Sequence, residues 1–212
     1  MSTQPNFNRV ARVYRWAEYL TLGPILQRTR THFLPQLTGC RKALLFGDGD
    51  GRFLTRLLRQ NRDLHATAVD VSATMLHLLR ERCAGAGSRL QTLQTSALEA
   101  PIAPGTDLIV THFFLDCLTQ TEVDTLAQKI SKNTDPGTLW LVSDFQIPPH
   151  AFIGYVAKLY IRSLYLAFRI LTGLRVKSLP NPQAALGQAH FACIAHHKTL
   201  FGLIYTEIWQ RR

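Results

Sequence analysis

Hydrophobic and polar positions follow two patterns along the middle of the chain: short apolar runs, and segments with apolar residues at helical spacing. The helical spacing predicts helices over 53–60, from Ser72 to about residue 82, and from Thr119 or Thr121 to about residue 131. Strands are predicted for the apolar runs at 43–46, 66–69, 90–94, 107–111 and 138–143. Repeated βα units of this length favour a mostly parallel sheet with helices on both faces.

The two ends of the chain depart from this repeat. Residues 6–34 have helical spacing that is broken at Gly23-Pro24, which predicts one helix before the break and a second helix that runs to about Leu34. Residues 191–195 and 200–209 are strand-like and only a few residues apart. Such strands must pair antiparallel, because a parallel pair needs a long crossover connection. The sequence thus predicts a doubly wound α/β fold that ends in an antiparallel hairpin.

A glycine-rich turn follows the first predicted strand, with Gly47, Gly49 and Gly51 alternating with aspartates. Glycines at such a turn let the chain bend sharply, let the backbone approach a ligand, and let the next helix pack closely on a strand. Asp70 ends the second predicted strand, where a carboxylate accepts hydrogen bonds from ribose hydroxyls. Arg52 stands where the dinucleotide fingerprint requires glycine, and there is no phosphate-binding P-loop motif. An ordinary strand-to-helix turn is the alternative reading.

Composition narrows the class of protein. A chain of 212 residues without repeats or a long linker suits one domain. The net charge of +10 favours an acidic partner such as nucleic acid, anionic lipid or an anionic metabolite, although solubility alone also explains it. Four scattered cysteines lack zinc-site spacing, and His196-His197 has no evident third ligand, so we expect no metal. No signal peptide is evident, so we expect a cytoplasmic protein with free thiols.

The ordered set of segments resembles the class I S-adenosylmethionine-dependent methyltransferases over residues 40–210. Five segments occur along this chain in the same order as in that family. They are the glycine turn, Asp70 with Ser72 and Met75, the segment 107–116, Pro136-Gly137 and the terminal hairpin. The resemblance implies a Rossmann-like sheet of seven strands, mostly parallel, with the last strand antiparallel beside the sixth. The N-terminal helices resemble the lid of small-molecule members such as the quinone-ring methyltransferases. The single domain then divides into a helical lid (1–38), a cofactor-binding half (40–147), a helical substrate-side insert (148–188) and a closing hairpin (189–212).

The same resemblance implies where S-adenosylmethionine binds. The expected cofactor residues are Gly47, Asp48, Gly49, Gly51, Asp70, Val71, Met75, Ser96, Ala97, Thr111, and Tyr14 and Tyr19 of the lid. Two positions depart from the family pattern. Leu45 stands where the family has an acidic residue that helps hold the methionine amino group, so we expect Asp48 or Asp50 to replace it. Ser96 stands where the family offers an aspartate to the adenine amino group.

The loop after the fourth predicted strand carries the candidate chemistry. His112 is able to accept a proton near neutral pH, and Asp116 either orients it or acts alone. In the alternative reading, His112 only contacts the cofactor and Asp116 caps the next helix. Asp144 is a second carboxylate on the same rim. The residues expected to line an apolar substrate pocket are Phe113, Phe114, Phe145 and Tyr155.

Segment 151–174 is mostly apolar, with Lys158, Arg162 and Arg169 as its charged residues. It has no charge-free run long enough to span a membrane. This segment has three interpretations: a buried helix, a wall of an apolar substrate pocket, or an interfacial helix on anionic lipid.

The expected function is methyl transfer to oxygen or carbon of a small apolar or aromatic metabolite. There are two alternatives. One is an RNA methyltransferase, which is disfavoured because no RNA-binding module is evident, and the other is a catalytically degenerate partner protein that binds the cofactor. The sequence does not indicate an oligomeric state.

Overall fold

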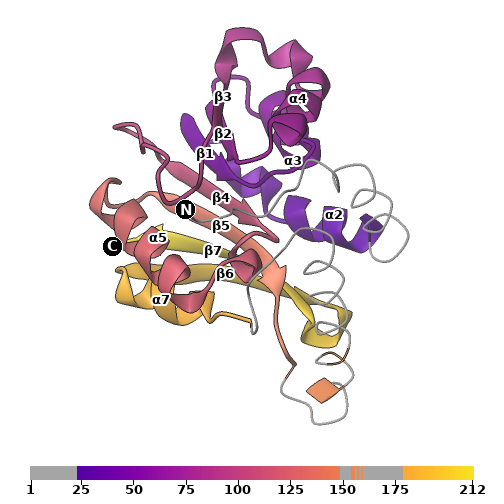
Figure 1. Cartoon of the computed structure of the whole chain (residues 1–212), viewed down its shortest axis with the longest axis vertical. Coiled ribbons are helices and arrows are strands. Elements are labelled where there is room, and N and C mark those ends of the chain that lie inside the picture. The colour runs from indigo at the N-terminus through magenta and orange to yellow at the C-terminus, as the bar shows by residue number, and fades with distance from the viewer. Residues whose placement is uncertain (1–22, 149–153, 156, 158, 160–178) are drawn as a thin grey trace.

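The computed structural model describes residues 23–148, 154, 155, 157, 159 and 179–212 (Figure 1). Seven strands form one sheet in the order β3-β2-β1-β4-β5-β7-β6. β1 to β5 are parallel, and β7 lies antiparallel between β5 and β6. The strands are β1 (Lys42–Phe46), β2 (His65–Asp70), β3 (Leu90–Gln94), β4 (Leu108–His112), β5 (Leu139–Phe145), β6 (Phe191–Thr199) and β7 (Ile204–Arg211). The predicted doubly wound, seven-stranded sheet with an antiparallel last strand is confirmed.

Helices cover both faces of the sheet because successive side chains of a strand point to opposite faces and both sets are apolar. Leu45 and Val110 face α3 (Arg52–Gln60), α4 (Ala73–Arg82) and the 3-10 helix η1 (Leu34–Leu37). Phe46, Ile109 and Trp140 face α5 (Gln120–Lys132) and α7 (Pro182–Gln188). Further short 3-10 helices are η2 (Ala84–Arg89), η3 (Leu115–Cys117) and η4 (Leu200–Gly202).

Two helix starts in the structure have the caps that the sequence indicates. The Ser72 hydroxyl accepts the backbone N–H of Met75 at the start of α4. At the start of α5, the Thr119 hydroxyl accepts the N–H of Glu122, whose carboxylate accepts the N–H of Thr119. This reciprocal capping box decides between the two predicted caps, since Thr119 rather than Thr121 ends the loop.

The predicted boundaries differ from the structure at two turns. The helix expected to run to Leu34 is α2 (Gly23–Thr31), which ends before η1. The 3-10 helix η1 starts at Leu34 with Pro35 in its first turn, where the missing N–H of proline breaks no helical hydrogen bond. The apolar pattern predicts Leu200 and Phe201 in the last strand, but they lie in η4 with positive φ values of 49° and 54°. The hairpin therefore turns where the apolar pattern predicts a strand.

Several predictions fall outside the described residues. They are the helix before residue 23, with Tyr14 and Tyr19, and almost all of segment 151–174, with Lys158, Arg162 and Arg169. The division into lid, cofactor half, insert and hairpin therefore stays a prediction. The described residues of the predicted lid, 23–38, hold α2 and η1, and α2 packs against α3 and β7. Within the described ranges, no helix has the length and apolar character that crossing a bilayer requires.

Candidate cofactor and acceptor site

The candidate site lies at the carboxyl ends of the parallel strands, beside the point where the strand order reverses. β1 has β2 on one side and β4 on the other, so the loops that leave β1 and β4 diverge there. The glycine turn follows β1, and Asp70 ends β2. His112 ends β4 and Phe145 ends β5. The sheet topology thus brings the predicted cofactor and acceptor residues to one edge.

The three glycines of the turn have different surroundings. A Cβ on Gly47 would lie 2.5 Å from Cδ2 of Phe114, and a Cβ on Gly51 would lie 3.0 Å from Cγ of Leu79 in α4. A Cβ on Gly49 would have no atom of the described residues within 4 Å. Gly49 is therefore the position where a ligand has room to approach the backbone. Gly51 permits the start of α3 to pack closely against α4. From the sequence, we instead expected a glycine of this turn to let the next helix pack on a strand.

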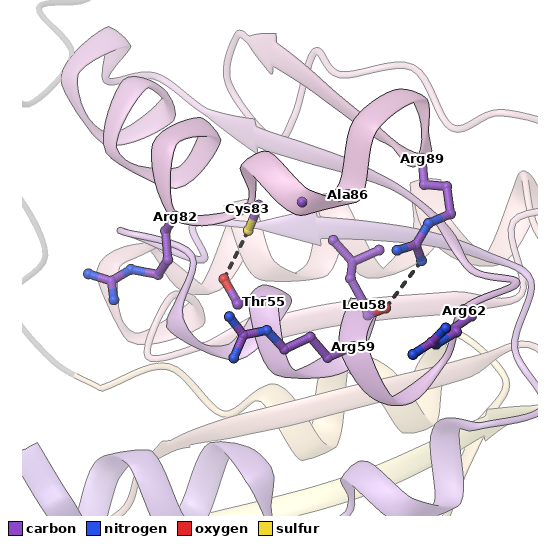
Figure 2. Close-up of a pocket in the computed structure, with 9 residues that line it drawn as sticks. Thr55, Leu58, Arg59, Arg62, Arg82, Cys83, Ala86 and Arg89 are labelled. Atoms are coloured by element: carbon purple, nitrogen blue, oxygen red, sulfur yellow. Dashed lines mark hydrogen bonds between the residues drawn. The ribbon is translucent and has the colours of Figure 1, made fainter.

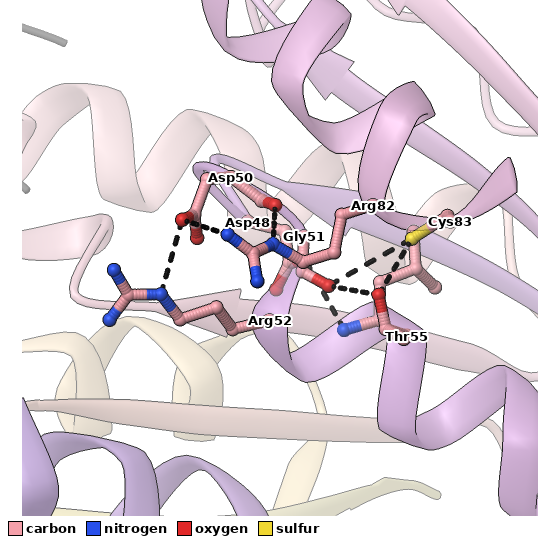
Figure 3. Close-up of polar contacts among 8 residues, drawn as sticks. Asp48, Asp50, Gly51, Arg52, Thr55, Arg82 and Cys83 are labelled. Atoms are coloured by element: carbon pink, nitrogen blue, oxygen red, sulfur yellow. Dashed lines mark hydrogen bonds and ion pairs between the residues drawn. The ribbon is translucent and has the colours of Figure 1, made fainter. Parts of the chain in front are cut away.

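The two aspartates of the turn have different partners. The Asp50 carboxylate pairs with Arg52 at 3.1 Å and with Arg82 at 2.9 Å (Figure 3). The Asp48 carboxylate accepts the backbone N–H of Leu54 in the first turn of α3, at 3.3 Å. Burial raises the pKa of Asp48 to about 7, although the positive charge of Arg30 acts in the opposite direction. Asp50 is thus neutralised by arginines, which leaves Asp48 as the carboxylate for a ligand cation.

Asp70 lies half-buried at the end of β2, and its carboxylate accepts the N–H of Ser72 at 2.8 Å. Burial raises the pKa of Asp70 to about 6, while the N–H groups of Ser72 and Val71 act to lower it. The amide of Gln94 donates to the carbonyl of Val71 at 3.3 Å and joins the ends of β2 and β3. The Ser96 hydroxyl accepts the N–H of Glu99 at 3.3 Å.

His112 is buried in the layer between the sheet and α3, with its ring 4.4 Å from that of Phe53. Its Nδ1 lies 2.9 Å from the Ser143 hydroxyl, which in turn donates to Thr206 at 2.8 Å. The network therefore assigns the imidazole proton to Nδ1. Nε2 is buried and has no hydrogen-bond partner among the described residues. Burial lowers the pKa of His112 well below its ordinary value, so the ring is neutral at pH 7.

Asp116, in η3, lies beside Asp144 of β5, and its carboxylate accepts a hydrogen bond from the Cys117 thiol at 3.4 Å. The backbone N–H of Asp116 donates to the Asp144 carboxylate at 3.1 Å, and Asp144 also accepts the N–H of Phe145 at 2.9 Å. Both carboxyls are buried, and burial raises the pKa of each; the charge of Asp116 raises that of Asp144 further. Since Ser143 orients His112 and Thr119 caps α5, the structure supports neither of the indirect roles that the sequence suggested for Asp116.

The expected substrate aromatics separate into two groups. The Phe113 and Phe145 rings lie 5.1 Å apart, and the Arg30 guanidinium lies 5.0 Å from the Phe113 ring centroid. Phe114 instead stacks on Phe46 at 6.2 Å and fills the space beside Gly47, so it supports the turn. Tyr155 exposes 70% of its surface. Thr111, an expected cofactor residue, is fully buried, and its hydroxyl accepts the indole N–H of Trp140 at 3.0 Å.

Arg30 and Ser143 are the site residues that sequence reasoning missed. Arg30 projects from α2 over Phe113 and is close enough to Asp48 and His112 to affect the pKa of each. Ser143 selects the tautomer of His112 from the neighbouring strand. Neither residue has a local sequence signal, because each is brought into place by the packing of a distant element.

Residues 43–137 match a protein family described as a methyltransferase domain, and this range holds the glycine turn, Asp70, His112 and Asp116. This chain contains an S-adenosylmethionine-dependent methyltransferase domain. The sheet order of the structure is the class I methyltransferase arrangement of the Rossmann-like fold. No curated protein matches the chain.

Solved structures are similar to the methyltransferase domain at low identity. The mitomycin 7-O-methyltransferase MmcR has a TM-score of 0.70 at 18% identity, over 98% of this chain and 61% of that one. An O-methyltransferase family 2 protein from Planctomyces limnophilus, solved with apigenin, has a TM-score of 0.70 at 18% identity, over 95% of this chain and 62% of that one. The chain thus spans only about three fifths of the length of these two proteins.

A third structure is closer in length. The N-methyltransferase NodS from Bradyrhizobium japonicum has a TM-score of 0.62 at 15% identity, over 88% of this chain and 97% of that one. These likenesses show the fold of the methyltransferase domain and do not identify its substrate.

Proposed function

We propose that this protein transfers a methyl group from S-adenosylmethionine to an oxygen or carbon atom of a small apolar or aromatic metabolite. The observation that carries the proposal is that β4 ends at His112 and β5 at Phe145, with the Phe113 and Phe145 rings 5.1 Å apart, at the same edge of the sheet as the glycine turn and Asp70. S-adenosylmethionine supplies an activated methyl group on its sulfonium. The protein then has to align the acceptor atom, remove its proton and exclude water.

The residues beside the glycine turn fit the cofactor. The space beside Gly49 admits the cofactor against the backbone, while crowding at Gly47 and Gly51 holds the turn in shape. Asp70 accepts hydrogen bonds from the ribose hydroxyls, and Asp48 holds the methionine ammonium, since Leu45 is fully buried in the core. The Ser96 hydroxyl would be the partner of the adenine amino group. Val71, Met75 and Ala97 supply apolar contacts, and we retain Tyr14 and Tyr19 as lid residues.

The acceptor side uses the loop after β4. Phe113 and Phe145 form an apolar wall, which Tyr155 extends. Nε2 of His112 carries the free lone pair of a neutral imidazole and is the first candidate base; because Nε2 is buried and burial disfavours the protonated ring, this role requires that Nε2 become accessible when the substrate binds. Ser143 fixes the ring so that Nε2 carries the free lone pair. Asp116 is the second candidate base, and Asp144 is its positioning residue.

The nature of similar proteins supports a small-molecule acceptor. Two of the solved structures are O-methyltransferases, one for mitomycin and one with apigenin bound, and a third is an N-methyltransferase. The first experiment is incubation of the purified protein with methyl-labelled S-adenosylmethionine and a metabolite extract. We expect label in an extractable small molecule. Label confined to RNA or to protein would contradict the proposal.

A matched pair of variants tests the role of His112. His112→Asn keeps an N–H donor for Ser143 but removes Nε2, whereas Ser143→Ala keeps Nε2 but removes the group that fixes the ring. If Nε2 accepts the substrate proton, His112→Asn loses about 10²–10⁴-fold in turnover and keeps its affinity for S-adenosylmethionine. Ser143→Ala is expected to lose less. Equal loss of turnover and of cofactor affinity in His112→Asn would argue against a base.

A further inference from the structure

A second cavity, of about 670 Å³, lies between α3, α4 and η2 (Figure 2). None of the described residues proposed for the cofactor or for the acceptor lines it. The cavity adjoins the last residue of the glycine turn: the Thr55 hydroxyl, in its lining, donates to the Gly51 carbonyl at 2.8 Å and lies 3.1 Å from the Cys83 thiol (Figure 3). The cavity is therefore a distinct site, and its ligand does not depend on the proposed function.

The described residues that line the cavity include four arginines and no acidic residue. The arginines are Arg59 in α3, Arg62 just beyond α3, Arg82 at the end of α4 and Arg89 at the end of η2. Figure 2 shows Arg89 across the cavity from Arg59 and Arg62. Like charges repel each other, and the Asp50 carboxylate pairs with Arg82 alone among these four arginines, so a bound anion would lower the repulsion among the others.

Two of the four arginines have internal partners. Arg82 donates to the carboxylate and to the backbone carbonyl of Asp50, at 2.9 and 2.8 Å. Arg89 donates to the carbonyls of Leu58 and Asn61, both at 3.2 Å, and so satisfies acceptors at the C-terminal end of α3. Within the part of the chain that the structure describes, Arg59 and Arg62 have no hydrogen-bond or ion-pair partner. Their guanidinium groups are available to a ligand.

The rest of the lining is apolar or small. Leu58 and Ala86 form an apolar floor between the arginines. Burial raises the pKa of the Cys83 thiol, so this group is neutral and contributes wall rather than a nucleophile. The volume is in the range of small-molecule sites. Single-stranded nucleic acid is bound mainly by stacking of bases on aromatic side chains, and none of the described lining residues is aromatic.

We propose that this cavity binds a phosphate ester of a small organic molecule, with the phosphate held by Arg59 and Arg62 and the organic part against Leu58 and Ala86. Guanidinium groups match phosphate oxygens with paired N–H donors, which makes arginine suited to such a ligand. Arg89 lies on the opposite wall and adds positive charge while its own bonds hold it in place.

Calorimetric titration of the whole protein with phenyl phosphate and with inorganic phosphate tests the proposal. We expect phenyl phosphate to bind, and to bind more tightly than inorganic phosphate because its ring buries apolar surface. Arg59→Gln and Arg62→Gln are each expected to weaken phenyl phosphate binding about tenfold, the loss of one charge-assisted contact. Arg56→Gln is the matched control, because Arg56 is exposed on α3 and does not line the cavity. It removes the same charge and should change the affinity less than about twofold.

Four results would overturn the proposal. Equal weakening by all three substitutions would mean that only the net charge of the protein attracts the anion. Absence of phenyl phosphate binding would show that the cavity is not a binding site for phosphate esters. Equally tight binding of inorganic phosphate and phenyl phosphate would show that the organic part of the ligand is not recognised. Binding of an RNA oligonucleotide that Arg59→Gln weakens, without binding of phenyl phosphate, would assign the arginines to nucleic acid. Thermal unfolding of each variant shows whether it folds; both arginines have exposed side chains, so we expect wild-type stability.

Discussion

Replacement of Gly47 by alanine tests whether the glycine turn is shaped by packing as well as by the cofactor. The backbone of Gly47 has a φ of +65°, and a Cβ there would lie 2.5 Å from Cδ2 and 3.2 Å from Cε2 and Cγ of Phe114. Gly49 has almost the same φ, +64°, but a Cβ there would have no atom of the described chain within 4 Å. The two positions thus share backbone strain and differ in steric overlap.

The expected free energies follow from these two terms. An alanine at a left-handed position costs about 1–2 kcal/mol, and this term applies to both variants. Overpacking against a well-ordered ring adds roughly 1–3 kcal/mol, and this term applies to Gly47→Ala alone. We therefore expect Gly49→Ala to lose ~1–2 kcal/mol of unfolding free energy and Gly47→Ala to lose ~2–5 kcal/mol.

Urea unfolding of both variants, followed by far-UV circular dichroism, measures the difference. The double variant Gly47→Ala/Phe114→Leu serves as a control, because the smaller side chain removes the overlap but leaves the φ strain. Its double-mutant cycle should show a favourable interaction between the two changes. Equal destabilisation by Gly47→Ala and Gly49→Ala would refute the packing argument. The affinity for S-adenosylmethionine should rank the two variants in the opposite order. Relative to its loss of unfolding free energy, Gly49→Ala should lose more affinity than Gly47→Ala.

Three further predictions concern the cofactor and the helix caps. Asp70→Ala should weaken S-adenosylmethionine binding by about 1–3 kcal/mol, as buried ribose hydroxyls lose their acceptor; unchanged affinity in a folded variant would show that the ribose lies elsewhere. Titrations of the wild type from pH 8 to pH 5 should show falling affinity, because Asp48 and Asp70, with pKa values of about 7 and about 6, take up protons and lose their charge; a flat profile would contradict both assignments. Thr119→Ala should lose about 0.5–2 kcal/mol of unfolding free energy through the capping box of α5, and Thr121→Ala, at the second residue of the helix, close to none; equal losses in urea unfolding would be inconsistent with the cap.

Much of the fold could be predicted because its signals are local. Apolar runs bounded by turn residues indicate the five parallel strands, and hydroxyl side chains at Ser72 and Thr119 mark helix starts through bonds that span three residues. The antiparallel pairing of the last two strands was predicted from the short connection between them alone. Its turn was misplaced because Leu200 and Phe201 have the apolar character of a strand while the backbone there turns.

The candidate site was predicted only in part. Spacing along the chain pointed to the turn, to Asp70 and to the loop after β4, but not to the direction of each side chain. Phe113 and Phe114 are adjacent and of one type, yet the first faces Phe145 and the second packs on Phe46. The difference arises at the positive φ of Phe113, +51°.

The sequence by itself determined the order of strands and helices, the glycine turn and the acid that follows it, because these depend on residues close together in the chain. Only the tertiary structure decided which groups are available for chemistry. Asp50 pairs with Arg82 of α4, whereas Asp48 accepts a backbone N–H of α3. Nε2 of His112 carries the free lone pair because Nδ1 bonds Ser143 on the next strand. Arg59 and Arg62 line a cavity because η2 folds across α3. Each of these outcomes depends on a contact between elements far apart in sequence, and no local pattern encodes such a contact.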